Sequence, residues 1–122
     1  MDIEWHPITD FYYFDSNHRC RHRKDPPRRW KQLSCVYKIR VGGKIIHVGR
    51  SDTCRKHGPA EKVRKAVIQL LGLESYNPSV GKTKQWQQLR LQHSPNSSNI
   101  HIGVIETKHV QKVYTEENQR TN

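Results

Sequence analysis

The sequence has few cysteines, few acidic residues and no long apolar run. Three cysteines, Cys20, Cys35 and Cys54, are an odd number, so we expect no disulfide framework and a reducing compartment. No run of 18 apolar residues is present to form a membrane-spanning helix, and the acidic start MDIEWHPITD is unlike a secretory signal. We therefore expect an intracellular protein, cytoplasmic or in the nucleoid or nucleus, with no membrane partner.

Several well-known site motifs are also missing. The sequence contains no phosphate-binding P-loop, no dinucleotide-binding glycine fingerprint and no nucleophilic-serine elbow. Residue types that bind zinc do occur, but without paired CxxC knuckles, so a zinc site is the less favoured interpretation. These residues are His18, Cys20, His22, Cys54 and His57.

Positive charge is abundant. The 22 Lys and Arg residues outnumber 11 Asp and Glu residues, which gives a formal net charge of +11. Such an excess predicts a polyanionic partner, and nucleic acid is the first choice because Lys and Arg release the counterions condensed on phosphates. The segment 18–31 is a basic loop in which Trp30 can stack on a base or anchor the loop to the body. The candidate nucleic-acid contacts are Arg28, Arg29, Trp30, Arg50, Arg64 and Lys65.

Composition divides the chain into an aromatic and basic arm at 1–33 and a folded domain at 34–122. In the arm, the aromatic run at 11–14 is more typical of core anchoring than of base stacking. The domain shows alternating or helical apolar spacing that predicts the order β-β-α-α-β-α. The expected elements are a hairpin at 34–49, helices at 58–72 and 83–93, a central strand at 100–105 and a helix at 108–120. The expected fold is therefore α+β, with a small three-stranded sheet, antiparallel or mixed, flanked by helices.

The hairpin carries a tyrosine on one strand and a histidine on the other. A two-residue turn at Gly42-Gly43 would pair Tyr37 with Val48, whereas a three-residue turn that includes Val41 would pair Tyr37 directly with His47. The second register places both polar groups on one face, so we take it as the hypothesis.

The triplets Cys35-Val36-Tyr37 and His47-Val48-Gly49, followed by basic residues and a helix, resemble the signature of the GIY-YIG nuclease family. The resemblance covers residues 35 to about 120, within the domain at 34–122. It implies a metal-dependent endonuclease that hydrolyses phosphodiester bonds in DNA, duplex or branched, with one Mg²⁺ or Mn²⁺ per active site; RNA is a possible substrate. The family site combines two tyrosines and an arginine around the phosphate with a glutamate that binds the metal.

The resemblance assigns roles to individual residues. Tyr37 matches the first tyrosine, which orients or activates water, and His47 stands in place of the second; an imidazole is a good general base near neutral pH. Arg55 is the expected phosphate clamp, with Arg50 and Arg64 as substitutes, and His57 supplies a nearby histidine. Glu117, on the inward stripe of the last helix, is the expected metal ligand; the alternative is that it pairs with a nearby lysine.

The chain departs from the family pattern at three points. Cys35 replaces a glycine, His47 replaces a tyrosine, and Arg55 follows Gly49 at an unusually short spacing. The alternative to a nuclease is therefore a non-catalytic nucleic-acid-binding module with a degenerate nuclease fold. A third interpretation is a protein-interaction adaptor that uses the aromatic arm. Groups dispersed on different faces of the sheet would favour plain binding.

Overall fold

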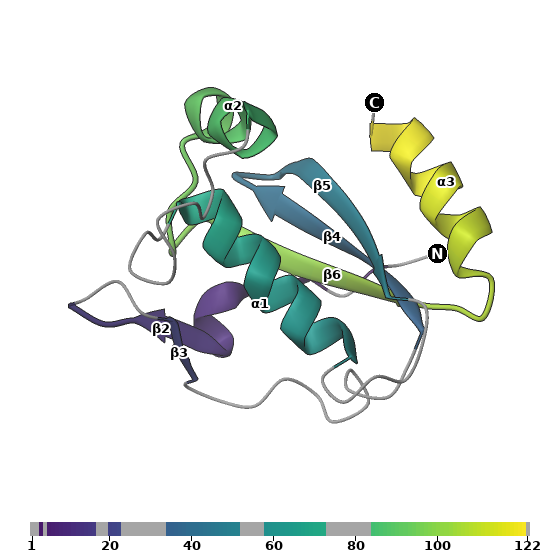
Figure 1. Ribbon diagram of the computed structural model, residues 1–122, viewed down its shortest axis with the longest axis horizontal. Helices are drawn as coiled ribbons and strands as arrows, with labels where there is room; N and C mark the ends of the chain where they lie inside the picture. Colours follow the sequence, from purple (N-terminus) through teal and green to yellow (C-terminus); the bar gives the residue numbers. More distant parts are fainter. Residues whose placement is uncertain are drawn as a thin grey trace.

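The computed structural model describes residues 3, 5–16, 20–22, 34–51, 58–72 and 84–121. The strands and helices within them form an α+β fold, as the sequence predicts (Figure 1). In chain order they are β1 (Trp5–Pro7), the 3₁₀ helix η1 (Ile8–Asp10), β2 (Tyr12–Phe14), β3 (Cys20–His22), β4 (Cys35–Val41), β5 (Lys44–Ser51), α1 (Gly58–Leu71), α2 (Lys84–His93), β6 (Ile100–Glu106) and α3 (Val110–Thr121).

The main sheet has four strands rather than the expected three. Its order is β1-β6-β4-β5, and every neighbouring pair is antiparallel. The additional strand is β1, which comes from the N-terminal arm and pairs with β6. A separate two-stranded sheet joins β2 to β3. The prediction of an inner strand at 100–105 is confirmed, because β6 lies between β1 and β4.

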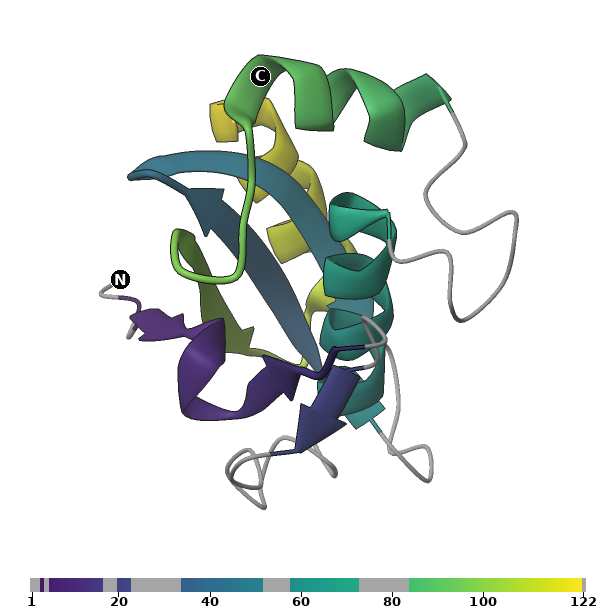
Figure 2. The same cartoon turned by 90° about the vertical axis from the view of Figure 1, so that its left-hand side faces the viewer.

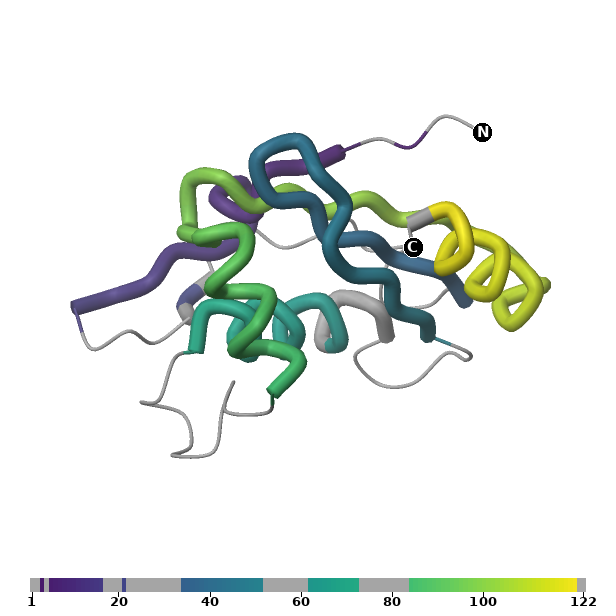
Figure 3. The backbone as a smooth tube through the Cα atoms, turned by 90° about the horizontal axis from the view of Figure 1, so that it is seen from above, coloured from purple at the N-terminus to yellow at the C-terminus, as the bar shows by residue number. Residues whose placement is uncertain are grey.

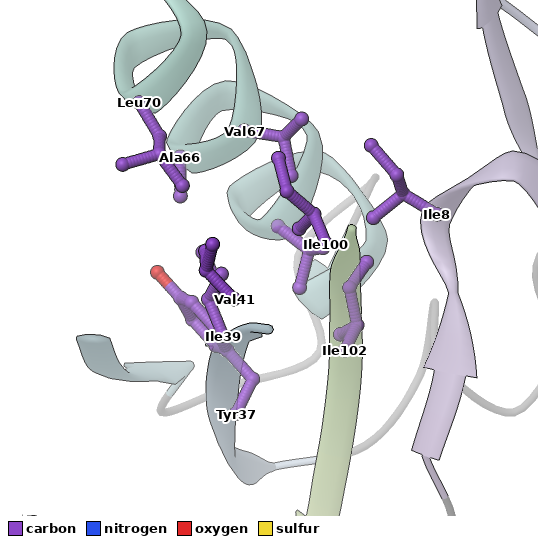
Figure 4. Packing of buried hydrophobic residues seen from close by; sticks show 10 residues of the cluster. Ile8, Tyr37, Ile39, Val41, Ala66, Val67, Leu70, Ile100 and Ile102 are labelled. Atoms are coloured by element: carbon purple, nitrogen blue, oxygen red, sulfur yellow. The ribbon is translucent and has the colours of Figure 1, made fainter. Parts of the chain in front are cut away.

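Alternate residues of the strands point to opposite faces of the sheet, and different helices pack on those faces. On one face, strand residues meet α1, and Figure 4 shows them pointing toward Ala66 and Val67. The buried members of this cluster are Ile8, Tyr37, Ile39, Val41, Val63, Ala66, Val67, Leu70, Ile100 and Ile102. On the other face, Val36, Val48 and Ile105 pack against Val110 at the start of α3. We call these the α1 face and the α3 face.

The helices begin and end near the predicted residues. α1 ends before Gly72, which adopts a left-handed φ of +67° and terminates the helix as its position predicts. α2 lies beside the end of α1 in Figures 2 and 3, and Arg90 joins the two helices. Its Nη1 donates to the carbonyl oxygens of Gln69 at 2.8 Å and of Leu70 at 3.4 Å, near the end of α1. The two figures also place α1 and α2 on the same side of the strands.

The hairpin between β4 and β5 turns at Gly42 and Gly43. Their φ angles of +57° and +90° are left-handed, which explains why glycine occupies both positions of this two-residue turn. Val41 pairs with Lys44 across the turn. The two-residue turn considered from the sequence is therefore present.

The register beyond the turn is different from both predictions. A bulge leaves Ile46 without a partner, so Ile39 pairs with His47 and Tyr37 pairs with Gly49. Both registers considered from the sequence are therefore wrong. The bulge nevertheless returns Tyr37 and His47 to the same face, because His47 pairs directly with Ile39, which shares a face with Tyr37 two residues earlier on β4.

The aromatic run of the arm anchors it to the body, as predicted. Phe11 and Tyr12 are buried against Ile68 of α1, whereas Tyr13 is exposed. Ile8 of the same arm is fully buried in the main core. Within the described part of the chain, no helix combines the length and apolar character needed to cross a membrane.

Candidate functional site

Tyr37 lies across Gly49 on the α1 face. A Cβ atom at residue 49 would collide with the ring carbons and the Oη of Tyr37, so the phenol occupies the space that a side chain would need. This contact gives a physical reason for a glycine in the triplet His47-Val48-Gly49. Burial, with smaller contributions from the Cys35 thiol and the Tyr114 phenol, raises the pKa of Tyr37 to about 12. Tyr37 is therefore a neutral hydrogen-bonding group at neutral pH.

His47 lies between two aromatic rings. Its ring centroid is 6.0 Å from that of Tyr37 and 5.1 Å from that of Trp86 on α2, with tilted planes in both contacts. Burial lowers the pKa of His47, so the imidazole is neutral at pH 7. The α1 face thus brings together two of the predicted catalytic residues, a neutral proton acceptor and a phenol.

Cys35, the first residue of the triplet that matches the family glycine, is a buried free cysteine. Burial raises the pKa of its thiol to about 12, an effect that the nearby Lys62 reduces. The thiolate is the nucleophilic form of cysteine, so Cys35 is a core residue and not a nucleophile at neutral pH.

Glu117 lies on the opposite face of the sheet from this pair. As predicted, it is buried, with 8% of the residue exposed, while Glu116 is exposed. Its carboxylate forms a salt bridge with Lys38, the neighbour of Tyr37 on β4. Adjacent strand residues point to opposite faces, so Lys38 and Glu117 occupy the α3 face while Tyr37 occupies the α1 face. The structure therefore does not bring Glu117 together with Tyr37 and His47 in one cavity.

The surroundings of Glu117 do not fit a divalent cation. The ammonium of Lys38 already contacts one carboxylate oxygen, and the guanidinium of Arg120 lies 3.6 Å from the other. A Mg²⁺ ion would have to share the carboxylate with these two cations, and like charges at such distances repel. In the described part of the chain, no three His, Cys, Asp or Glu side chains gather as a possible metal site. The Mg²⁺ or Mn²⁺ cofactor stays a prediction.

Positive side chains gather near the end of β5. The guanidinium carbon of Arg50 lies 5.1 Å from the ring centroid of Tyr114 on α3. Lys62 reaches the backbone of the same residue from α1, on the other face of the sheet, and donates from Nζ to the carbonyl oxygen of Arg50 at 2.9 Å. Lys65 is exposed and lies one turn further along α1, a spacing that puts it beside Lys62. Arg64, between them in sequence, is half-buried.

Five predicted site residues lie outside the described residues. They are Arg28, Arg29, Trp30, Arg55 and His57. The zinc interpretation also depends on residues beyond the described side chains, including His18 and Cys54. The roles predicted for these residues stay predictions.

Sequence reasoning did not identify the individual partners of the predicted site residues. Lys38 is one, although a lysine in an apolar strand flanked by Tyr37 and Ile39 is itself a signal, because a buried ammonium needs a carboxylate. Helical spacing predicts that Trp86 lies on an inward face, but nothing in that spacing indicates that it contacts His47.

We compared the chain with family models, with curated proteins and with solved structures, and none of them matches it.

Proposed function

We propose that this protein binds nucleic acid through a cationic patch formed by Arg50, Lys62 and Lys65, on a sheet with a degenerate GIY-YIG-like arrangement. The observation that carries the proposal is the hydrogen bond from Lys62 Nζ to the Arg50 carbonyl oxygen, which holds α1 and β5 together at the patch. The patch draws its cations from two elements, and Tyr114 holds the guanidinium of Arg50 from a third.

Charge and geometry make phosphate the natural ligand. The guanidinium of Arg50 offers paired donors to phosphate oxygens, and the two lysines of α1 add point charges along the same edge strand. The formal charge of +11 attracts the nucleic acid from a distance. Contacts of this kind fix the position of a duplex without reading its sequence, so we expect binding that is strong at low salt and largely independent of sequence.

Fluorescence anisotropy with a labelled DNA duplex tests the proposal directly. We expect the double variant Lys62→Gln/Lys65→Gln to bind more weakly than the unmodified chain. It should also reduce the slope of log affinity against log salt by about 2, one unit for each phosphate that the variant no longer neutralises. Arg50→Gln should reduce the slope by about 1 on the same basis.

The matched control removes the same charge elsewhere. Lys108 and Lys112 are exposed near the start of α3, so Lys108→Gln/Lys112→Gln lowers the net charge equally without touching the patch. If both double variants show the same decrease in affinity and in salt slope, binding follows net charge alone and the patch is not the interface. If the unmodified protein does not bind duplex DNA at low salt, the proposal fails outright.

The contact between Tyr37 and His47 favours a second candidate, hydrolysis of phosphodiester bonds. A neutral imidazole can accept a proton from water, and the phenol beside it can orient that water by a hydrogen bond. Against this candidate, both groups are largely enclosed by α1 and α2, and the carboxylate that resembles the family metal ligand pairs with Lys38 on the other face. Binding is therefore the function that the described geometry supports better.

Nicking of a supercoiled plasmid, with Mg²⁺, with Mn²⁺ and with a chelator, separates the two candidates. Hydrolysis by this site predicts nicks that His47→Gln and Tyr37→Phe abolish while duplex binding persists. A protein that binds the plasmid without nicking it under any of these conditions is a binding module. Nicks that survive both substitutions would come from another site or from a contaminating nuclease.

A further inference from the structure

Three side chains from three strands come together on the α3 face, away from the cationic patch. Arg40 of β4 pairs in register with His101 of β6, and His101 pairs with Pro7 of β1. Trp5 of β1 completes the group, since its partner Gly103 lies two residues from His101 on the same face. Side chains at such positions are neighbours across the strands. We call Trp5, Arg40 and His101 the Trp5 corner.

Gly103 allows the corner to form. A Cβ atom at residue 103 would lie 2.5 Å from Cγ2 of Ile3 and 3.2 Å from two ring carbons of Trp5. Because this position has no side chain, the indole can lie over β6 and reach the arginine of the next strand. The guanidinium carbon of Arg40 lies 4.4 Å from the centroid of the Trp5 ring. The indole thereby holds the guanidinium in a defined orientation.

The positive charge of the corner has no matching negative charge in the described part of the chain. Arg40 is half-buried, yet among the described residues its guanidinium has no carboxylate partner, and its Nε has no hydrogen-bond partner. The Nδ1 atom of the neighbouring His101 is likewise buried without a partner there. A partly buried cation without a counter-charge is costly to the folded state, and a bound anion reduces that cost. The pattern is that of a site for an anion beside a flat ring.

We propose that the Trp5 corner binds single-stranded nucleic acid, with a phosphate at Arg40 and a base stacked on the planar groups of Trp5 and Arg40. Exposed bases stack on aromatic rings and on guanidinium planes, whereas bases within a duplex are already stacked on each other. The inference rests on the proposed function and deepens it, because the cationic patch binds a backbone of either form. The corner adds a preference for unpaired nucleotides.

Binding of labelled single strands, compared with the duplex, tests the corner. We use a thymidine homopolymer, a uridine homopolymer of the same length and the duplex, so that DNA and RNA are distinguished. Arg40→Gln should weaken binding of the single strands on the order of tenfold, because one base no longer stacks and one phosphate has no cation beside it. Binding of the duplex should change by less than about twofold, since only the patch contacts it.

Two further variants show what the arginine supplies. Arg40→Lys keeps the charge but lacks a planar group that stacks, so we expect most of the weakening seen with Arg40→Gln. Lys44→Gln removes an exposed charge at the nearby hairpin turn and should leave single-strand affinity within about twofold. Equal weakening for single strand and duplex, or full binding by both Arg40 variants, would overturn the inference and leave the cationic patch untouched.

A measurement on the unmodified protein covers the case in which an Arg40 variant does not fold. Nuclear magnetic resonance follows the indole N–H of Trp5 and the Nε–H of Arg40 while a thymidine dinucleotide is added. We expect both signals to shift, and both shifts to saturate at the same dinucleotide concentration. A dinucleotide that shifts signals at Arg50 and Lys62 but not at Trp5 would refute the corner and support the patch.

Discussion

The two faces of the main sheet bury very different chemistry under their helices. On the α1 face, Tyr37, His47 and Trp86 form a neutral group of rings. On the α3 face, Lys38 and Glu117 form a buried salt bridge. The difference arises from neighbouring residues of one strand, because β4 sends Tyr37 to one face and Lys38 to the other. Residues that the family resemblance groups into one site are therefore separated by the sheet itself.

The largest effect should come from breaking the salt bridge on the α3 face. Both side chains are nearly enclosed, with 7% of Lys38 and 11% of Glu117 exposed. Lys38→Met leaves a buried carboxylate without its ammonium partner, so we expect a decrease of about 3 kcal/mol in the free energy of unfolding. Urea denaturation measures it. The double variant Lys38→Met/Glu117→Leu should recover most of this stability, since it buries no charge.

Because the two faces are separated by the sheet, a second result is expected for Lys38→Met. In the folded fraction of Lys38→Met, the chemical shifts of His47 and Trp86 should stay unchanged, because these rings lie across the sheet. Glu116→Gln, one residue away on the exposed side of α3, should change stability by less than about 0.5 kcal/mol. If Lys38→Met lowers the free energy of unfolding no more than Glu116→Gln does, the salt bridge on the α3 face does not stabilise the folded protein.

A smaller effect should follow from adding a methyl group at Gly49 on the α1 face. Gly49→Ala drives a Cβ into the ring of Tyr37, a rigid group inside the core, so we expect a cost of about 2 kcal/mol from overpacking. The same substitution at Gly103 on the α3 face meets Ile3 and Trp5, which belong to the edge of the sheet and can shift more easily. Gly103→Ala should therefore cost less.

A double-mutant cycle assigns the cost at Gly49 to its cause. In a Tyr37→Leu background the shorter side chain no longer covers residue 49, so Gly49→Ala should cost clearly less there than in the unmodified chain. Thermal unfolding of the four proteins gives the coupling. An equal loss of stability in both backgrounds would mean that the backbone conformation, and not the ring of Tyr37, requires glycine at position 49.

The elements of the domain at 34–122 were predictable, whereas strand β1 of the arm and the faces of the sheet were not. Apolar spacing and the terminators Gly42-Gly43 and Gly72 place the hairpin and the helices, because these signals are local. The bulge at Ile46 has no such signal, since Ile45 and Ile46 suit either face equally well. Helical spacing likewise shows that Glu117 points inward, but it does not show which face of the sheet α3 covers. That choice depends on the path of the chain between β6 and α3.

Substitution of Arg90, at the junction of α1 and α2, should have an effect of intermediate size on the free energy of unfolding. Its guanidinium neutralises the carbonyl end of α1, and Arg90→Gln should cost about 1 kcal/mol through the loss of these charge-assisted hydrogen bonds. Hydrogen exchange should show faster opening of α2, which carries Trp86. Gln87→Ala, an exposed change on the same helix, serves as the control. Unchanged exchange in α2 would show that Trp86, not Arg90, holds this helix.

The smallest effect should appear in the pH dependence of stability. In the unfolded chain, the pKa of His47 has its ordinary value of 6.5, and burial on the α1 face lowers it in the folded protein. Between these two pKa values the unfolded chain binds more protons, so the free energy of unfolding rises with pH. His47 therefore contributes stability above pH 6.5 that is lost as the pH falls through its folded pKa. Urea denaturation at neutral and mildly acidic pH should show a smaller acid loss for His47→Gln than for the unmodified chain, whereas His109→Gln, at an exposed position, should keep the full loss. If all three proteins lose the same free energy of unfolding at acidic pH, His47 is solvated in the folded protein and is not part of the neutral group of rings on the α1 face.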